Sequence, residues 1–210
     1  MKHKAPFITF EGGEGSGKST QIEILYRKLL LAEIDVVSYR EPGGTNGAEE
    51  IRHLLMEGEG DRWNPITEAL LMSAARADLV QRHILPQLEK GTWVLCDRFT
   101  DSTLAYQGYG HELGYDRIQE LNHFTVGTLV PDLTFILEIN SDVGLERTAL
   151  RKTGINRFER YDVMFHRKVA EGYAEILKKN PDRCVAVNAF LDIDMISNFI
   201  YDTVKQRFNI

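Results

Sequence analysis

A glycine-rich segment near the start of the chain has the residue types and the spacing of a phosphate-binding loop. It reads Gly12-Gly13-Glu14-Gly15-Ser16-Gly17-Lys18-Ser19, which is the pattern G-x-x-x-x-G-K-S of a P-loop. Glycines allow backbone N–H groups to converge on phosphate oxygens, and the start of the following helix adds about half a positive charge. We therefore expect Lys18 to reach the β- and γ-phosphates of a nucleotide, and Ser19 to offer its hydroxyl group to Mg²⁺.

Polar side chains also follow two later apolar runs. Asp97 and Arg98 come at the end of the run 92–97, and a glycine-rich loop at 40–47 follows the preceding run. Asp97 is placed to hold Mg²⁺ or its water shell, and Arg98 to grip an anion with two parallel hydrogen bonds. Each of these segments also has a purely structural interpretation. Asp97 could cap a helix, 40–47 could be an ordinary turn, and the polar residues at 102–108 could begin a surface helix. A second anion site beside the P-loop would indicate that the protein transfers a phosphoryl group from one ligand to another.

The elements that must position these residues alternate between strands and helices. Short apolar runs predict strands at 6–11, 35–39, 92–97, 132–139 and 183–187. Apolar residues at helical spacing predict helices at 17–33, 48–56, 67–89, 116–129, 143–151, 161–179 and 193–208. This order is typical of an α/β three-layer sandwich, in which helices flank a five-stranded parallel sheet. Ligands of such sheets bind beyond the carboxyl ends of the strands, where the P-loop and Asp97 fall.

Length and composition bound the other possibilities. The chain has 210 residues, enough for a single domain over 1–210 with its own core. Its 25 basic and 31 acidic residues give a net charge of −6, which argues against a protein that coats nucleic acid. No apolar run approaches the length of a membrane helix. Cys96 and Cys184 lie in apolar runs, so we expect buried, reduced thiols and a cytoplasmic protein. The sequence has no Cys-x-x-Cys and its histidines lack metal-ligand spacing, so we expect no zinc site.

Taken together, the spaced motifs closely resemble the thymidylate kinase (dTMP kinase) family of the bacterial type, and the match extends over essentially the whole chain. The residues that carry the resemblance are the segments Glu11–Ser19, Arg40–Thr45, Glu68–Met72 with Arg76, Asp97–Phe99 and Ala105–Gly108. The resemblance implies the P-loop nucleoside monophosphate kinase fold and a homodimer. It also implies Mg²⁺-dependent transfer of the γ-phosphoryl group of ATP to dTMP, which gives dTDP and supplies dTTP for DNA replication.

The resemblance also implies roles for individual residues of the acceptor site. Glu14 would contact the sugar near its 3′-hydroxyl, and Arg98 would grip the acceptor phosphate. Arg76 would hydrogen-bond the thymine edge, with Gln107 over the same base. Tyr106 would fill the space of a ribose 2′-hydroxyl and so select deoxyribose.

Four further residues complete the dTMP site that the resemblance implies. Arg52 would be an additional cation, and Ser102 lies beside Arg98 in the sequence. Pro42 follows a peptide bond that is commonly cis in the family. Met72 stands where the family usually has a phenylalanine that stacks on thymine, and a methionine still packs on a ring. The implied dTMP site is Glu14, Pro42, Arg52, Met72, Arg76, Arg98, Ser102, Tyr106 and Gln107.

A basic segment follows the fourth predicted strand. Residues 147–168 hold seven lysines and arginines and only two acidic residues, so this stretch is +5 and the rest of the chain is −11. Such a run is often a solvated face, but beside a P-loop and an acceptor site it favours a cationic lid at about 147–160. The bacterial type lacks a basic residue in the P-loop, here Gly15, and carries an arginine in the lid instead. Arg151 is the first candidate and Arg157 the second.

The remaining assignments concern the donor site. Arg147 would flank the adenine of ATP, with the loop Asn188-Ala189 on its other side. The ATP site would then consist of Arg147 and the P-loop residues Gly12, Gly13, Glu14, Gly15, Ser16, Gly17, Lys18 and Ser19. Mg²⁺ would be held by Ser19 and Asp97, partly through water. The catalytic set would be Lys18, Arg98, Arg151 and Glu14.

Two alternative functions stay open at this point. The first is another P-loop mono- or nucleoside kinase, against which Arg76, Tyr106 and Gln107 argue. The second is a regulator that binds ATP without catalysis, which would not need an acceptor site. A GTPase switch is not indicated, because the guanine-reading motif Asn-Lys-x-Asp is absent from the sequence.

Overall fold

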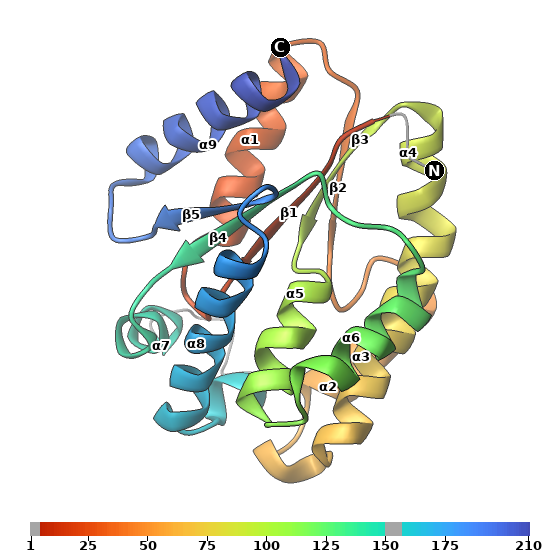
Figure 1. Ribbon diagram of the computed structural model, residues 1–210, viewed down its shortest axis with the longest axis vertical. Helices are drawn as coiled ribbons and strands as arrows, with labels where there is room; N and C mark the ends of the chain where they lie inside the picture. The colour runs from red at the N-terminus through yellow and green to blue at the C-terminus, as the bar shows by residue number, and fades with distance from the viewer. Residues whose placement is uncertain (1–4, 150–156) are drawn as a thin grey trace.

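The computed structural model describes residues 5–149 and 157–210, and a five-stranded sheet forms its centre (Figure 1). All four strand pairs are parallel, and the strand order is β2-β3-β1-β4-β5. The strands are β1 (Phe7–Gly12), β2 (Val36–Arg40), β3 (Trp93–Asp97), β4 (Leu133–Glu138) and β5 (Cys184–Asn188). The expected fold class is thereby confirmed, and every strand begins and ends within one residue of the prediction.

Helices cover both faces of the sheet, as Figure 1 shows. On one face, α1 (Lys18–Leu31) and α9 (Ile193–Phe208) bury Leu25, Leu29 and Ile200 against the strands. Each such leucine or isoleucine contributes about 1.5–3 kcal/mol when fully buried. The other face is covered by α3 (Pro65–Leu79), α4 (Leu85–Lys90), α6 (Tyr115–Val126) and α8 (Val163–Lys179). The strands are buried on both faces, which is why their sequences are nearly continuous apolar runs.

The structure departs from the sequence prediction in two helical regions. The single helix expected over 67–89 is divided into α3, a π-helical turn η2 (Val80–Ile84) and α4. Pro86 lies in the first turn of α4, where its missing N–H group removes a helical hydrogen bond. Residues 100–110, for which a helix start was only one alternative, form α5 (Thr100–Thr103) and the π-helical η3 (Leu104–Gly110).

The remaining elements are short. They are α2 (Asn46–Met56), the 3-10 turns η1 (Gly60–Arg62) and η4 (Arg157–Arg160), and α7 (Ser141–Ala149). Both cysteines are free and buried, as expected. Within the described residues, no helix combines the length and the apolar character needed to cross a membrane.

A backbone-to-backbone contact joins α7 to the P-loop. Gly144 of α7 lies so close to the loop that a Cβ atom at this position would stand 2.3 Å from the carbonyl oxygen of Glu14. A Cβ atom on Gly15 would in turn stand 2.1 Å from the carbonyl oxygen of Gly144. Two glycines from segments far apart in the sequence therefore allow α7 to rest directly on the phosphate loop.

Gly144→Ala should destabilise the protein, because the added methyl group forces the backbone of α7 and the P-loop apart. Overpacking of this kind costs about 1–3 kcal/mol, and each kcal/mol lowers the Tm of a chain of this size by roughly 2–4 °C. The matched control is Gly47→Ala, also in a helix, where the nearest atom is Asp78 Oδ2 at 3.6 Å. Thermal unfolding followed by circular dichroism measures both variants, and equal Tm values for the two would refute the contact's importance.

Candidate active site

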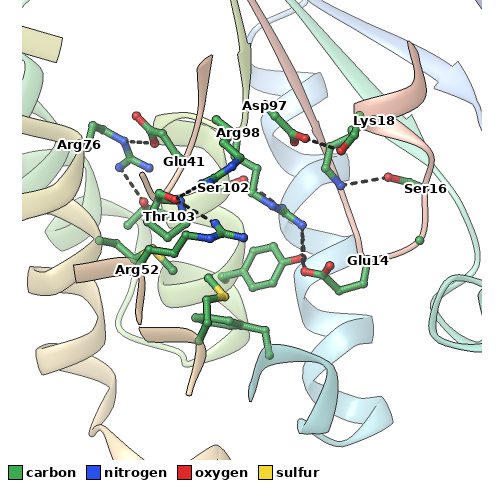
Figure 2. A pocket seen from close by; sticks show the side chains of 18 of the residues that line it. Glu14, Ser16, Lys18, Glu41, Arg52, Arg76, Asp97, Arg98, Ser102 and Thr103 are labelled. Atoms are coloured by element: carbon green, nitrogen blue, oxygen red, sulfur yellow. Dashed lines mark hydrogen bonds and ion pairs between the residues drawn. The ribbon is translucent and has the colours of Figure 1, made fainter. Parts of the chain in front are cut away.

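A cavity of about 400 Å³ opens beyond the carboxyl ends of β1, β2 and β3. It is lined by the P-loop and the start of α1, the loop after β2, and residues of α2, α3, α5 and η3 (Figure 2). All nine residues of the expected acceptor site line it, as do Gly15, Ser16, Gly17, Lys18, Ser19 and Asp97. Gly12, Gly13 and Arg147 do not line this cavity, and Arg151 lies outside the described residues.

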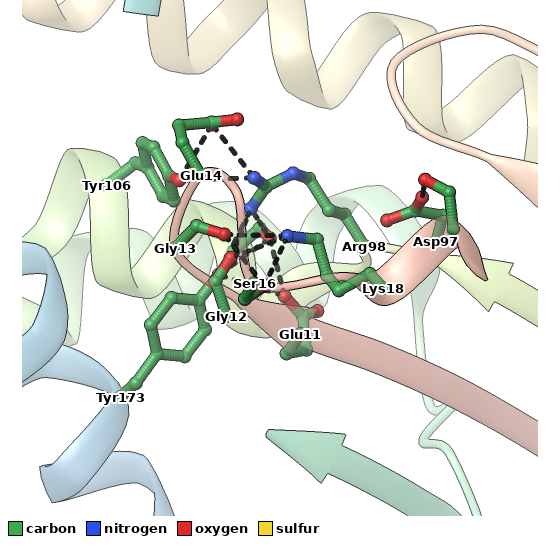
Figure 3. A network of polar contacts seen from close by, with 12 residues as sticks. Glu11, Gly12, Gly13, Glu14, Ser16, Lys18, Asp97, Arg98, Tyr106 and Tyr173 are labelled. Carbon is green, nitrogen blue, oxygen red and sulfur yellow. Dashed lines mark hydrogen bonds and ion pairs between the residues drawn. The ribbon is translucent and has the colours of Figure 1, made fainter. Parts of the chain in front are cut away.

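The P-loop wraps around the ammonium group of Lys18. Its Nζ atom donates hydrogen bonds to the carbonyl oxygens of Gly12 (3.0 Å) and Gly13 (2.8 Å) and lies 3.2 Å from Ser16 Oγ (Figure 3). Gly17, with a φ of 90°, occupies the left-handed region immediately before α1, where other residues would be strained. Burial, assisted by the nearby charge of Arg98, lowers the pKa of Lys18 to about 8.

Ser19 and Asp97 meet at the mouth of the cavity. The Ser19 hydroxyl donates to Asp97 Oδ2 at 2.8 Å, although the two residues are 78 positions apart in the chain. A hydroxyl and a carboxylate oxygen are ligands that Mg²⁺ prefers, and this ion usually takes one or two carboxylates with substrate phosphates and water. No group of three metal-binding side chains occurs in the part of the chain that the structure describes. The pair Ser19–Asp97 therefore fits a magnesium ion that is held largely by its nucleotide.

Arg98 is the most heavily contacted cation of the site. Its Nη2 atom donates to Glu14 Oε1 (2.9 Å) and to the Tyr106 hydroxyl (3.2 Å), and Nη1 donates to Gly12 O (3.1 Å). The guanidinium carbon lies 5.0 Å from the centre of the Tyr106 ring. The backbone at Arg98 has a φ of 71°, a strained conformation for a residue with a side chain. This left-handed conformation directs the side chain from the end of β3 into the cavity.

Glu14 and Tyr106 complete a triangle with Arg98, as Figure 3 shows. The Tyr106 hydroxyl donates to Glu14 Oε1 at 3.0 Å. Burial alone would raise the pKa of Glu14, but the positive charges of Arg98 and Lys18 outweigh it and hold the pKa below the ordinary value. Glu14 is therefore a carboxylate at neutral pH, shared between a guanidinium and a phenol.

Beneath this triangle lies Glu11, which the sequence analysis did not assign. Its carboxylate accepts hydrogen bonds from the Phe99 backbone N–H (2.7 Å), the Ser102 hydroxyl and the Tyr173 hydroxyl (3.1 Å). Burial and the nearby Asp101 raise the pKa of Glu11 to about 7. The only signal in the sequence was an acidic residue at the end of an otherwise apolar strand. Tyr173, from α8, gave no signal because it lies on an apolar helix face.

One wall of the cavity is built around Arg76. Its guanidinium donates to Glu41 Oε2 (2.7 Å), Thr103 Oγ1 (2.7 Å) and Phe99 O (2.9 Å), and the whole side chain is buried. Glu41 precedes Pro42 through a cis peptide bond, as the resemblance implies. Arg52 donates from Nη1 to the Pro42 carbonyl oxygen at 2.9 Å, which fixes the same loop from α2.

The structure corrects the assignment of Arg157 as a second candidate for the lid arginine. Its side chain is fully buried, and the guanidinium donates to Glu68 Oε2, to the Leu55 carbonyl oxygen (2.8 Å) and to the Tyr161 hydroxyl (2.8 Å). Held by these partners, Arg157 does not line the cavity that the P-loop lines. The sequence showed only a charge in a basic run and gave no sign of its buried partner.

Arg147 lies beside the loop that follows β5. Its Nη1 atom donates to the Ala189 carbonyl oxygen at 3.2 Å, so the two segments that were expected to flank adenine are neighbours. Whether a purine lies against them stays a prediction.

Comparison with known proteins agrees with this geometry. A model of the thymidylate kinase family matches residues 10–200. The chain is 50% identical over 201 residues to the thymidylate kinase of Caulobacter vibrioides, covering 96% of both chains. It is 48% identical over 203 residues to that of Afipia carboxidovorans, covering 96% of this chain and 89% of the relative. The crystal structure of thymidylate kinase from Ehrlichia chaffeensis has a TM-score of 0.78, 33% identity and coverage of 96% and 98%. The chain thus belongs to the thymidylate kinase family.

Proposed function

We propose that the protein transfers the γ-phosphoryl group of ATP to dTMP, giving ADP and dTDP in the synthesis of dTTP. Membership of the family makes the reaction class that of an ATP-dependent nucleoside monophosphate kinase. The observation that carries the proposal is one cavity that is lined both by the P-loop, which includes Glu14, and by the other eight residues expected for a dTMP site. A regulator that only binds ATP would not need the residues of the dTMP site.

The acceptor half of the reaction needs positioning and charge rather than covalent chemistry. Arg98, at the end of β3, is proposed to hold the acceptor phosphate with two parallel hydrogen bonds. Arg76, Gln107 and Met72 would hold the base, and Tyr106 would exclude a 2′-hydroxyl. Arg52, Pro42 and Ser102 would frame the phosphate, while Glu14 would meet the sugar.

The donor half would be held by the P-loop. Its backbone N–H groups and Lys18 would bind the β- and γ-phosphates of ATP, with Arg147 beside the adenine. When bound by Ser19 and Asp97, Mg²⁺ would neutralise charge on the phosphates. We propose that Arg151, in a lid at about 147–160, adds a cation to the transferred group, which can be worth about 10³–10⁵ in rate. Closure of such a lid would exclude water from the phosphoryl group.

Three proposals about the whole chain accompany this function. We propose one domain over 1–210 and a cytoplasmic location, which the two free thiols support. We also propose a homodimer. Exposed apolar side chains lie on the packed helices α3 and α6, namely Ile66, Leu70 and Phe124, and a second copy would cover them.

A coupled assay of ADP release tests the proposed function directly. With ATP and Mg²⁺ fixed, dTMP should give the highest kcat/KM among dTMP, dUMP, thymidine, AMP and CMP, because the acceptor wall matches a deoxynucleoside monophosphate. Nucleotide binding without dTMP-dependent ADP release would indicate a regulator. Preference for another acceptor would indicate a different P-loop kinase.

Binding of ATP should take up a proton at about pH 8.5 through Lys18. Burial holds the pKa of this amine at about 8 in the free protein, so at that pH it is largely neutral. The phosphates of ATP favour its charged form and raise the pKa, and the amine is then protonated on binding. Calorimetry in two buffers of different ionisation enthalpy measures the uptake, which should shrink at about pH 7. Lys18→Met should abolish it, and an unchanged buffer dependence in this variant would refute the assignment.

Phe124→Glu should shift the protein towards monomers, because the Phe124 side chain is 90% exposed on the proposed interface. Leu31→Glu is the matched control, since Leu31 is 86% exposed at the end of α1, on the other face of the sheet. Sedimentation equilibrium measures the mass of each. A monomeric native protein, or a dimeric Phe124→Glu variant, would contradict the interface.

A further inference from the structure

A fully buried carboxylate lies behind the acceptor wall. Glu68 of α3 is 0% exposed, and both of its oxygens are occupied. Oε1 lies 2.9 Å from Gln107 Nε2 and 3.0 Å from His111 Nε2, and Oε2 accepts from Arg157 Nη2 and from the Tyr161 hydroxyl (3.0 Å). We refer to Glu68, Gln107, His111, Arg157 and Tyr161 as the Glu68 cluster. The partners come from η3, from η4 and from the residues next to these turns.

The cluster brings together segments that lie far apart in the sequence. Arg157 spans 89 positions to reach Glu68, and its Nε atom donates to the carbonyl oxygen of Leu55 in the last turn of α2. Phe165 of α8 packs on the rings of His111 (4.8 Å between centroids) and Tyr161 (4.3 Å). The carboxylate of Glu68 is thus the common acceptor of a tightly packed polar centre.

The residues next to these partners form the wall of the active-site cavity. Met56 follows Leu55, Phe158 follows Arg157, and both line the cavity together with Gln107. The Phe158 ring meets the Tyr106 ring edge-to-face at 6.1 Å. The contacts of Glu68 therefore help to position the residues of this wall, although Glu68 itself does not line the cavity.

Glu68 also determines which group Gln107 can present. An ionised carboxylate only accepts hydrogen bonds, so it must take the N–H₂ group of the Gln107 amide and leaves Oε1 as the amide's acceptor. The inference places this amide at the edge of the base and not over its ring. An amide fixed in this sense favours a base edge that donates an N–H group. Thymine carries such a donor at N3, whereas cytosine has an acceptor at the same place.

We propose that Glu68 is a positioning residue for acceptor specificity, which fixes the Gln107 amide so that the site prefers thymine over cytosine. The inference rests on the proposed function, because it concerns the base of the acceptor. It goes beyond that function by assigning part of the choice between the two pyrimidines, in which Arg76 would also take part at the base edge, to a residue outside the cavity.

Glu68→Gln tests the proposal. The new amide has a donor of its own, so Gln107 can turn over and the ratio of kcat/KM for dTMP to that for dCMP should fall about tenfold or more. The KM for ATP should stay within about twofold, because the P-loop is not part of the cluster. Equilibrium binding of dTMP and dCMP, measured by calorimetry without ATP, should show the same loss of preference.

A second variant protects the test against simple misfolding, since Glu68→Gln removes the carboxylate that pairs with the buried Arg157 guanidinium. The double variant Glu68→Met with Arg157→Met replaces the ion pair by apolar side chains of similar volume, an exchange that is often neutral for stability. It should fold and still lose the preference for dTMP. If either folded variant keeps the native ratio, the proposal is wrong.

Two controls separate positioning from general damage. Arg183→Gln breaks another, partly buried ion pair, between Arg183 and Asp101, which shares no residue with the Glu68 cluster. It should lower the Tm and leave the dTMP-to-dCMP ratio unchanged, and a matching loss of ratio would overturn the proposal. In a Gln107→Ala background, Glu68→Gln should have little further effect on the ratio, because both act through one amide. An additive effect would also overturn it.

These outcomes are distinct from a failure of the proposed function. If the native protein does not phosphorylate dTMP at all, the proposed function and this inference both fail. If it does so with native specificity in the Glu68 variants, only the inference fails.

Discussion

The parallel pairing of β1 with β3 is the constraint on which the site depends. The register sets Phe10 opposite Asp97, so the P-loop and the Asp97-Arg98 pair leave the sheet side by side. Every contact between the two halves of the cavity follows from this alignment, including Ser19 with Asp97 and Glu14 with Arg98. A slip of β3 by one residue would turn Asp97 and every other side chain of that strand to the opposite face of the sheet, and would separate Asp97 from Ser19.

The electrostatic balance of the cavity is local and is not visible in the net charge of −6. Lys18 and Arg98 are like charges in a poorly solvated space, and the charged form of each is favoured by the nearby carboxylates of Glu14 and Asp97. The same principle recurs behind the wall, where Arg157 is matched by Glu68. Removing one member of a buried pair of this kind typically costs about 3–5 kcal/mol, whereas replacing both can be neutral. Removing a single charged residue from these buried pairs should therefore cost more stability than replacing both partners together.

The sequence predicted the parts of the molecule that local patterns encode. Apolar runs indicated the five strands, and the resemblance named the residues of the acceptor wall, all of which line one cavity. It did not predict Glu11, Glu68 or Tyr173 as members of the site, because their partners lie between 39 and 162 positions away. It also misjudged Arg157, since a charge in a basic run looks the same whether it is solvated or buried. The π-helical turns were missed because their hydrophobic spacing differs little from that of an α-helix.

The contact between Glu14 and Arg98 has a consequence for turnover. In the free protein the guanidinium already holds a carboxylate at 2.9 Å, so an incoming anion exchanges one partner for another and does not enter an empty, hydrated site. The loss of the Glu14 contact offsets part of the attraction between Arg98 and the anion, so any phosphate at Arg98 would bind more weakly than at an unpaired guanidinium. When the anion departs, the carboxylate returns and stabilises the vacated guanidinium. Where Arg98 holds the acceptor phosphate, as proposed above, an intramolecular competitor of this kind weakens ground-state binding, and weaker ground-state binding leaves more of the binding energy for the transition state.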